Sequence, residues 1–239
     1  MIKIAAIIPA FNEEENIEAV VDSIIDIKSL QFGIDPIVVN DCSRDRTVEI
    51  VKSLNCTVLD LPVNLGIGGA VQTGFKYAYE NKYDYAIQVD GDGQHPANEI
   101  EKLFLNMIKD NCDVIIGSRF ILNEGFQSTA LRRFGIQYFM WLNKVLLGIK
   151  ITDCTSGFRL VNCKVLKLVC DYYPDEYPEP ESIVFFRLNN LKIKEVPVEM
   201  KERLGGVSSI GFVSSVYYMI KVTLGIFFTF IRVKFQKNT

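Results

Sequence analysis

The stretch YAIQVDGDGQHP, residues 85–96, joins the pattern of a strand to a pair of carboxylates. The apolar run at its start is typical of the end of a buried strand. Asp90 and Asp92 follow two residues apart, so on an extended backbone their side chains point to the same side. Gly91 and Gly93 leave room for a ligand to approach the backbone. The segment therefore has the pattern of a ligand-binding site.

Two neighbouring carboxylates repel each other unless a cation lies beside them. Mg²⁺ usually takes one or two carboxylates together with phosphate oxygens. Asp90 and Asp92 therefore predict a Mg²⁺ or Mn²⁺ site that carries a phosphorylated substrate. The alternative is a plain surface turn, because Asp-Gly dipeptides are common in turns. The rest of the chain favours the metal site.

Strand and helix patterns alternate on both sides of this segment. The predicted strands are residues 3–8, 37–39, 57–61, 85–89 and 113–116, and the predicted helices are residues 13–27, 46–54, 69–79 and 98–108. This order predicts an α/β fold with a mostly parallel central sheet flanked by helices. Ligands of such sheets bind beyond the carboxyl ends of the strands.

Polar or glycine-rich segments follow four successive predicted strands. They are Pro9–Glu13, Asn40–Asp45, Asn64–Gly69 and Asp90–Asp92. Each alone also fits a helix cap or a turn, but together at one rim they predict a binding site. The glycine cluster is not a dinucleotide fingerprint, because Val71 stands where the last glycine of Gly-x-Gly-x-x-Gly belongs, and no Walker motif occurs.

The composition excludes several classes of protein. The chain has 239 residues, which suits one large α/β domain or two small ones. Its net charge of −3 gives no electrostatic footprint for nucleic acid. One histidine, His95, and six cysteines without a Cys-x-x-Cys pair argue against zinc and for reduced thiols. The start of the chain reads as a strand rather than a signal peptide, so we expect a cytoplasmic protein.

Six segments in combination resemble the inverting family 2 glycosyltransferases of the GT-A fold, especially the dolichol-phosphate mannose synthase and polyprenol-phosphate glycosyltransferase branch. They are Pro9–Glu13, Asn40–Asp45, Asn64–Gly69, Asp90–Pro96, Gly117–Phe120 and Thr155–Arg159. The resemblance covers roughly residues 3–210. It implies a metal-dependent transfer of a sugar from a UDP-, GDP- or dTDP-sugar to a lipid-linked, polyprenyl-phosphate-type acceptor or to a saccharide.

The resemblance also implies roles for the residues that bind the donor. Pro9, Phe11 and Glu13 would line the nucleotide pocket. Asp41 would accept a hydrogen bond from the base.

A second group would act on the diphosphate. Asp90, with Gly91 beside it, would lie near the ribose and the metal. Asp92 and Gln94 would hold the metal. Arg203 would close over the diphosphate, where negative charge develops as the sugar leaves.

On the acceptor side, three arginines are candidates for a cationic cup around a lipid phosphate. They are Arg119, Arg132 and Arg133. The dolichol-phosphate enzymes tend to carry a serine one turn after the helix arginine, and here that place holds Gln137 or Ile136. This departure leaves a saccharide acceptor open.

A hydroxyl acceptor needs a general base, whereas a phosphate acceptor is already an anion. Three carboxylates are candidates for that base: Glu179, Glu181 and Asp153. Glu181 also fits the start of a helix, and His95 fits a structural role better than a catalytic one.

The C-terminal part has a different character. We expect residues 1–210 to form the catalytic domain and residues 211–239 to form an apolar helix with a basic tail. Residues 212–231 would extend about 30 Å as a helix, enough to span a bilayer. Lys221 near the middle opposes a span at a cost of about 2.5–3.5 kcal/mol. Peripheral attachment to the cytoplasmic face of the membrane is the favoured prediction, and packing in a homo-oligomer is the next.

Two other functions compete with sugar transfer. A sugar nucleotidyltransferase would carry a glycine-rich loop with Arg and Lys after the first strand, but Pro9–Glu13 stands there. A degenerate nucleotide-sugar-binding scaffold would have no need of the intact set Asp90, Asp92 and Arg203.

Overall fold

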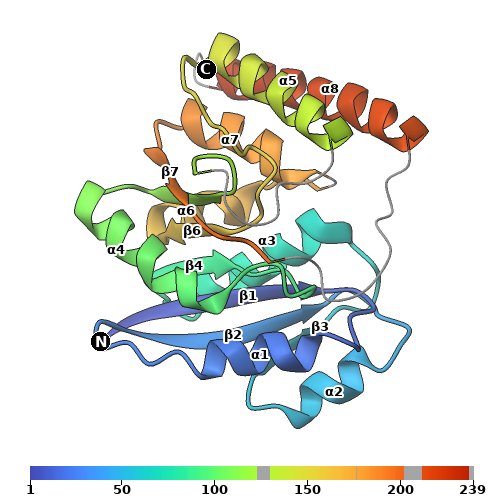
Figure 1. The fold of residues 1–239 in the computed structure, drawn as a ribbon, viewed down its shortest axis with the longest axis vertical. Coiled ribbons are helices and arrows are strands. Elements are labelled where there is room, and N and C mark those ends of the chain that lie inside the picture. Colours follow the sequence, from blue (N-terminus) through green and yellow to red (C-terminus); the bar gives the residue numbers. More distant parts are fainter. Residues whose placement is uncertain (123–129, 176, 202–211, 237–239) are drawn as a thin grey trace.

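The computed structural model describes residues 1–122, 130–175, 177–201 and 212–236 (Figure 1). A single seven-stranded sheet runs through the molecule in the order β3-β2-β1-β4-β6-β5-β7. Its strands are β1 (Ile2–Ala10), β2 (Phe32–Asn40), β3 (Thr57–Asp60), β4 (Tyr85–Gln88), β5 (Val114–Ser118), β6 (Arg159–Asn162) and β7 (Ile193–Pro197).

Parallel pairing dominates the sheet, as the alternating pattern predicts. β1 pairs in parallel with β2 and β4, β2 with β3, and β5 with β7. β6 is the exception, because it is antiparallel to both β4 and β5. Its first residue, Arg159, therefore lies at the same edge as the carboxyl ends of the parallel strands, one place beyond the pair Ile87–Leu160.

Helices cover both faces of the sheet. Their bounds are α1 (Ile17–Ile25), α2 (Thr47–Ser53), α3 (Gly66–Glu80), η1 (Ala97–Glu99, a 3₁₀ turn), α4 (Ile100–Asp110), α5 (Ala130–Leu147), α6 (Cys163–Asp171), α7 (Pro178–Leu188) and α8 (Phe212–Gln236). One core contains buried residues of α1, α2 and α4, such as Ile24 and Phe104. The other contains buried residues of α3, α6 and α7, and it also includes residues of α5 and α8, which pack on α7. Alternate residues of β1 enter the two cores.

Two helices begin at other residues than the sequence predicts, α1 later and α3 earlier. α1 starts at Ile17 instead of residue 13, because a turn closes first with the Asn16 N–H donating to Glu13 O at 3.0 Å. α3 starts at Gly66 instead of residue 69, because the Asp41 carboxylate accepts the amides of Leu65 and Gly66. A local turn thus sets the start of α1, whereas a tertiary contact sets the start of α3.

The C-terminal helix exists, but the description of it as simply apolar is incomplete. Val222, Ile226 and Val233 form a buried face against α7. A second apolar stripe is exposed on the other side of α8: Tyr217, Ile220, Leu224, Phe227, Phe228 and Phe235. None of the helices within the described ranges has the length and hydropathy needed to cross a bilayer.

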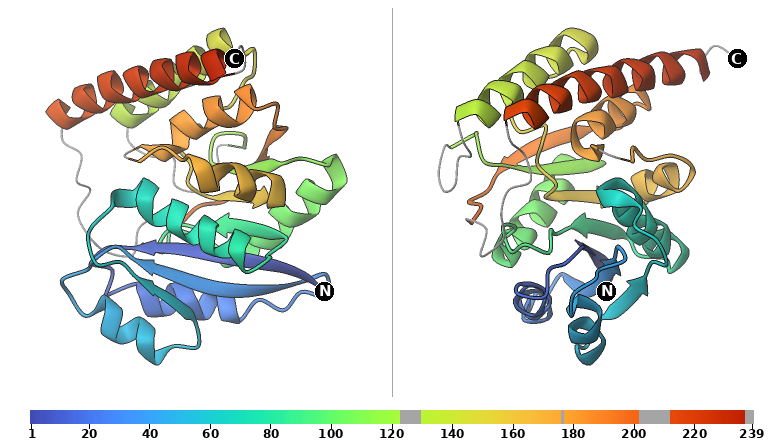
Figure 2. Two further views of the ribbon diagram at one scale, coloured as in Figure 1. Left: turned by 180° about the vertical axis from the view of Figure 1, so that it is seen from behind. Right: turned by 90° about the vertical axis from the view of Figure 1, so that its right-hand side faces the viewer.

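α5 and α8 lie side by side as an outer layer over α7, far from α2 (Figures 1 and 2). The hydroxyls of Tyr138 on α5 and Thr223 on α8 are 3.1 Å apart. α7 contacts both this layer and β7, so it connects α8 with the sheet.

Candidate active site

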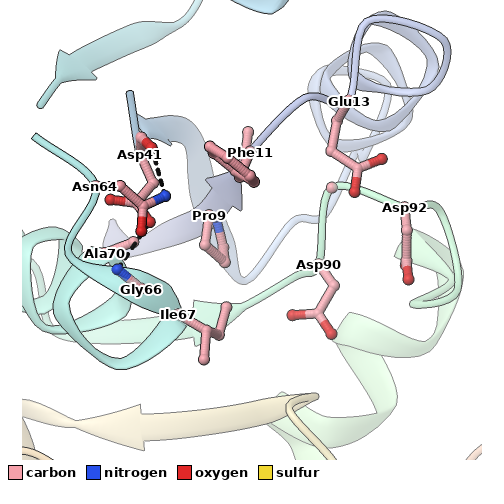
Figure 3. Close-up of a pocket in the computed structure, with 12 residues that line it drawn as sticks. Pro9, Phe11, Glu13, Asp41, Asn64, Gly66, Ile67, Ala70, Asp90 and Asp92 are labelled. Carbon is pink, nitrogen blue, oxygen red and sulfur yellow. Dashed lines mark hydrogen bonds between the residues drawn. The ribbon is translucent and has the colours of Figure 1, made fainter. Parts of the chain in front are cut away.

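A cavity of about 370 Å³ lies where β1, β2 and β4 end (Figure 3). Its walls come from the segments after these strands and from the start of α3: Pro9, Ala10, Phe11, Glu13, Asp41, Asn64, Gly66, Ile67, Ala70, Asp90, Gly91 and Asp92. This volume is typical of a small-molecule site. The structure thus brings together residues from all four of the segments that the sequence singles out.

One end of the cavity is built around Asp41. Its carboxylate oxygens accept the N–H groups of Leu65 at 2.6 Å and Gly66 at 2.9 Å, and Asn64 Nδ2 donates to its backbone carbonyl at 3.0 Å. Gly66 has φ +76°, a left-handed conformation that favours glycine. A carboxylate offers about four acceptor positions, and the described residues fill two of those on Asp41.

The two polar segments that border this end are bonded to each other. Asn12 N–H donates to the Ser43 hydroxyl at 3.0 Å, and Glu13 N–H donates to the Thr47 hydroxyl at 2.9 Å. The pKa of Asp45 is lowered, because hydrogen bonds from Thr47 and from backbone amides outweigh the opposing effect of burial. Residues 11–13 are therefore held in place although the Phe11 ring is 47% exposed at the mouth of the cavity.

The other end of the cavity carries Asp90 and Asp92 (Figure 3). Asp90 Oδ1 accepts a hydrogen bond from Gln88 Nε2 at 2.9 Å. The Asp90 N–H donates to His95 Nδ1 at 2.9 Å, which makes Nε2 the protonated nitrogen when the ring is neutral. That nitrogen lies 3.6 Å from Asp90 Oδ2, and the ring stacks on Phe158. The single histidine thus positions Asp90, in line with its predicted structural role.

Asp92 is 7% exposed, and its Oδ1 accepts the N–H of Gln94 at 3.1 Å. Hard carboxylate oxygens from Asp90 and Asp92 suit Mg²⁺ or Mn²⁺. Within the described residues no three His, Cys, Asp or Glu side chains gather as a metal-ligand cluster. A site of two carboxylates fits a metal that takes its remaining ligands from phosphate oxygens and water.

Beyond Asp90, on the side of β6, lies Glu179 in the first turn of α7. Burial raises the pKa of Glu179; its neighbour Asp90 adds to this, and Arg159 opposes it. Gly157 leaves room for the side chains of Gln88 and Asp90, because a Cβ there would lie 2.6 Å from Gln88 Nε2 and 3.3 Å from the Asp90 carboxylate. Among the three candidate bases, Glu179 is the one beside Asp90.

Asp153 forms an ion pair with Arg119. It is fully buried, and it accepts Arg119 Nε at 2.7 Å and Nη2 at 2.8 Å, while its own amide donates to Glu195. Burial alone would lower the pKa of Arg119, but Asp153 raises it. This geometry disfavours Asp153 as a base. The same ion pair engages the guanidinium of Arg119, for which the family resemblance predicts a role in binding a lipid phosphate.

Glu181 contacts another helix. Its Oε1 accepts the hydroxyls of Tyr172 at 2.8 Å and Thr229 at 2.5 Å, which joins α7 to α8. Arg203 falls outside the described residues, and the side chains of Arg132 and Arg133 are likewise not described. Their predicted roles remain predictions.

The sequence places Asn64–Gly69 at the rim, and Asn64, Gly66 and Ile67 of that segment line the cavity. Sequence reasoning assigned no role to Ala70 or Arg159. Ala70 lines the cavity directly after that segment. Arg159 is 2% exposed and donates to Ser156 O, Cys154 O and the Ser182 hydroxyl. No local pattern distinguishes such a buried arginine from a surface charge.

Known proteins resemble this chain in sequence and in fold. A profile described as Glycosyl transferase family 2 matches residues 5–169. The UDP-N-acetylglucosamine–dolichyl-phosphate N-acetylglucosaminyltransferase of Methanococcus voltae is 31% identical over 213 residues, covering 81% of this chain and 83% of its own. The undecaprenyl-phosphate mannosyltransferase of Micrococcus luteus is 27% identical, covering 86% of each chain.

Among solved structures, glucosyl-3-phosphoglycerate synthase from Mycobacterium tuberculosis, in complex with Mn²⁺, UDP-glucose and phosphoglyceric acid, superimposes with a TM-score of 0.71. It is 17% identical, and the match covers 95% of this chain and 79% of that one. This likeness concerns the fold, which is that of the GT-A glycosyltransferases. Together with the family match, it establishes that the chain is a glycosyltransferase of family 2 with the GT-A fold.

Proposed function

We propose that this enzyme transfers a sugar, with inversion, from a UDP-sugar to a polyprenyl phosphate at a membrane surface. The observation that carries the proposal is the order of groups along the rim: Asp41 at β2, Pro9 at β1, Asp90 at β4 and Glu179 beside β6. A nucleotide-sugar is itself a linear array of base, ribose, diphosphate and sugar. Laid along this rim, each part meets a group of matching chemistry.

The base would occupy the end near Asp41. A carboxylate accepts the ring N–H of uracil, and the exposed face of Phe11 is available for stacking. One relative whose name specifies UDP-N-acetylglucosamine, and solved neighbours in complex with UDP-sugars, support a uridine nucleotide.

The diphosphate would lie over Asp90 and Asp92. A divalent cation held there would neutralise the charge that develops on the diphosphate as the sugar leaves. Gly91 keeps this end compact, because a Cβ there would lie 3.1 Å from Pro9 O and 3.4 Å from Glu13 Cγ.

The sugar would then lie beside Glu179, which we propose hydrogen-bonds its hydroxyls. An oxygen of the acceptor phosphate forms the new bond to the anomeric carbon from the face opposite the diphosphate. The bond to the diphosphate breaks as this one forms, and the departing nucleotide keeps the electron pair. Because the acceptor is already an anion, no general base has to remove a proton.

The acceptor class is inferred from the relatives and from charge. α5 and α8 carry six of the chain's 26 basic residues and none of its 29 acidic residues. The two helices therefore hold a charge of +6, and the 20 basic and 29 acidic residues elsewhere give −9. An exposed apolar stripe on a basic layer suits the surface of an anionic membrane.

The same charge argues against the predicted homo-oligomer. In a twofold dimer through this layer, the same surface of both copies would form the interface. Six positive charges of one copy would then face the same six charges of the other. Repulsion of that kind disfavours association unless anions intervene.

A transfer assay tests the proposal. The full chain is incubated with Mn²⁺, radiolabelled UDP-N-acetylglucosamine or UDP-glucose, and undecaprenyl phosphate in phosphatidylglycerol vesicles. We expect label in the lipid phase, and none with Asp92→Ala. Transfer only from GDP-sugars would overturn the uridine assignment. Label only on added saccharides would overturn the lipid acceptor.

A further inference from the structure

The carboxylate of Glu181 links α8, in the outer helix layer, to the first turn of α7. Glu181 Oε1 accepts hydrogen bonds from the Tyr172 hydroxyl at 2.8 Å and from Thr229 Oγ1 at 2.5 Å. Thr229 is 2% exposed, so this contact is shielded from solvent. Packing alone does not need such an arrangement, because apolar side chains of similar size join helices at least as well as buried charges do.

The contact surface of α8 is shaped around this carboxylate. A Cβ at Gly225 would lie 2.6 Å from Glu181 Oε2, so glycine leaves the space that the carboxylate fills. One turn later Thr229 donates to it. A further turn on, the Arg232 guanidinium lies 4.0 Å from the centre of the Tyr172 ring. Three positions on one side of α8 therefore converge on Glu181 and its partner.

The turn that carries Glu181 also carries Glu179. On the sheet side, Arg159 Nη1 donates to the Ser182 hydroxyl at 2.7 Å, and that hydroxyl donates to Glu179 O at 3.2 Å. On the α8 side, the turn is held through Glu181. The first turn of α7 is thus fixed between the sheet and α8, with Glu179 beside Asp90.

We propose that Glu181 is a positioning residue, through which α8 fixes the first turn of α7 and thereby the side chain of Glu179. The inference rests on the proposed function, in which Glu179 contacts the donor sugar. It makes α8 part of the catalytic unit as well as of the membrane-facing layer.

Two substitutions disturb the contact by different means. Thr229→Val removes the hydroxyl that donates to Glu181 and keeps the shape of the side chain. Gly225→Ala pushes the carboxylate aside, although alanine favours a helix more than glycine does. The matched control is Thr223→Val, which removes another α8 hydroxyl, bonded to Met219 O and close to Tyr138 of α5. Thr229→Ser restores the hydroxyl.

Two measurements read the outcome. Hydrogen exchange of the amides at residues 181–185 should accelerate in Thr229→Val and Gly225→Ala, and stay at the wild-type rate in Thr223→Val and Thr229→Ser. In the transfer assay, kcat should fall about 10- to 100-fold for the first two variants while KM for the donor stays unchanged, because misplacement of the turn affects the sugar end of the site.

The inference is overturned if Thr229→Val and Gly225→Ala match the Thr223→Val control in hydrogen exchange, or if they exchange faster but keep the wild-type kcat. Failure of the proposed function looks different, since the wild-type protein itself would then transfer no sugar. The exchange measurement would in that case still decide whether α8 fixes the α7 turn.

Discussion

At the scale of single residues, the burial of the Glu179 carboxyl lowers the stability of the folded protein at neutral pH. Burial raises the pKa of this carboxyl above its ordinary value of 4.5, and Asp90 acts in the same direction. The folded protein therefore binds this proton more tightly than the unfolded chain does. The stability linked to the group is present below pH 4.5 and is lost as the pH rises through the folded-state pKa. Such a cost is typical of a functional site.

Glu179→Gln should consequently separate stability from activity. At about pH 7.5 the variant should have a higher Tm than the wild type, and the difference should shrink as the pH falls through the folded-state pKa of Glu179 towards 4.5. Loss of a charged hydrogen bond to the sugar should lower kcat by roughly 10- to 100-fold. Thermal unfolding across this pH range and the transfer assay measure both. The exposed Glu18→Gln is the control, and a variant with reduced Tm at neutral pH would contradict the assignment.

At the scale of elements, the two opposite sides of α8 have different surroundings. Its buried side packs on α7, while its exposed side presents aromatic residues such as Phe227 and Phe228, which are 51% and 63% exposed. Trp141 and Val145 on α5 are exposed as well. Exposed aromatic residues next to lysines are the composition of interfacial helices.

Binding to anionic vesicles tests this reading of α5 and α8. The protein should sediment with phosphatidylserine vesicles and much less with phosphatidylcholine vesicles. Phe227→Ser with Phe228→Ser, and Lys144→Glu with Lys234→Glu, should each weaken binding by at least about tenfold, since each basic residue near such a surface contributes roughly 1 kcal/mol.

The control pair for this experiment is Lys28→Glu with Leu30→Ser, which lies at exposed positions outside α5 and α8. Equal binding by all variants would count against the membrane face. A dimer in solution that the Phe227 and Phe228 changes dissociate would support packing between copies of the chain instead.

At the scale of the whole molecule, the sheet presents one rim and the helices present one basic layer. The rim collects groups from β1, β2, β4 and the start of β6, while α7 connects it to α5 and α8. A ligand that spans Asp41 and Asp92 should therefore stabilise the fold as a whole, since it joins segments far apart in the chain.

Thermal unfolding with nucleotide and metal measures this effect. At about 100 times its Kd, UDP with Mn²⁺ should add about 2.7 kcal/mol of stability, which corresponds to roughly 5–10 °C in Tm for a chain of this size. Removal of Mn²⁺ by EDTA, or Asp92→Ala, should abolish the metal-dependent part. Asp22→Ala, on the exposed side of α1, should retain it. An equal shift with and without Mn²⁺ would refute a metal at Asp92.

The alternation of strands and helices, the mostly parallel sheet and the rim at which its polar segments meet could all be predicted from the sequence. These follow from local periodicity, and from the rule that parallel strands end at a common edge. Pro9 and Asp90 directly follow apolar runs, and Asp41 and Asp92 come within three residues after one, so all four are recognisable.

Which charged groups remain available for chemistry depends instead on how distant segments pack in the folded protein. Asp153 and Glu181 stand in sequence contexts as suggestive as that of Glu179, yet one is paired with Arg119 and the other bonds Thr229. The physical reason is that burial and partners come from segments distant along the chain, such as α8 against α7. A carboxylate's role depends on that environment, which local sequence does not encode.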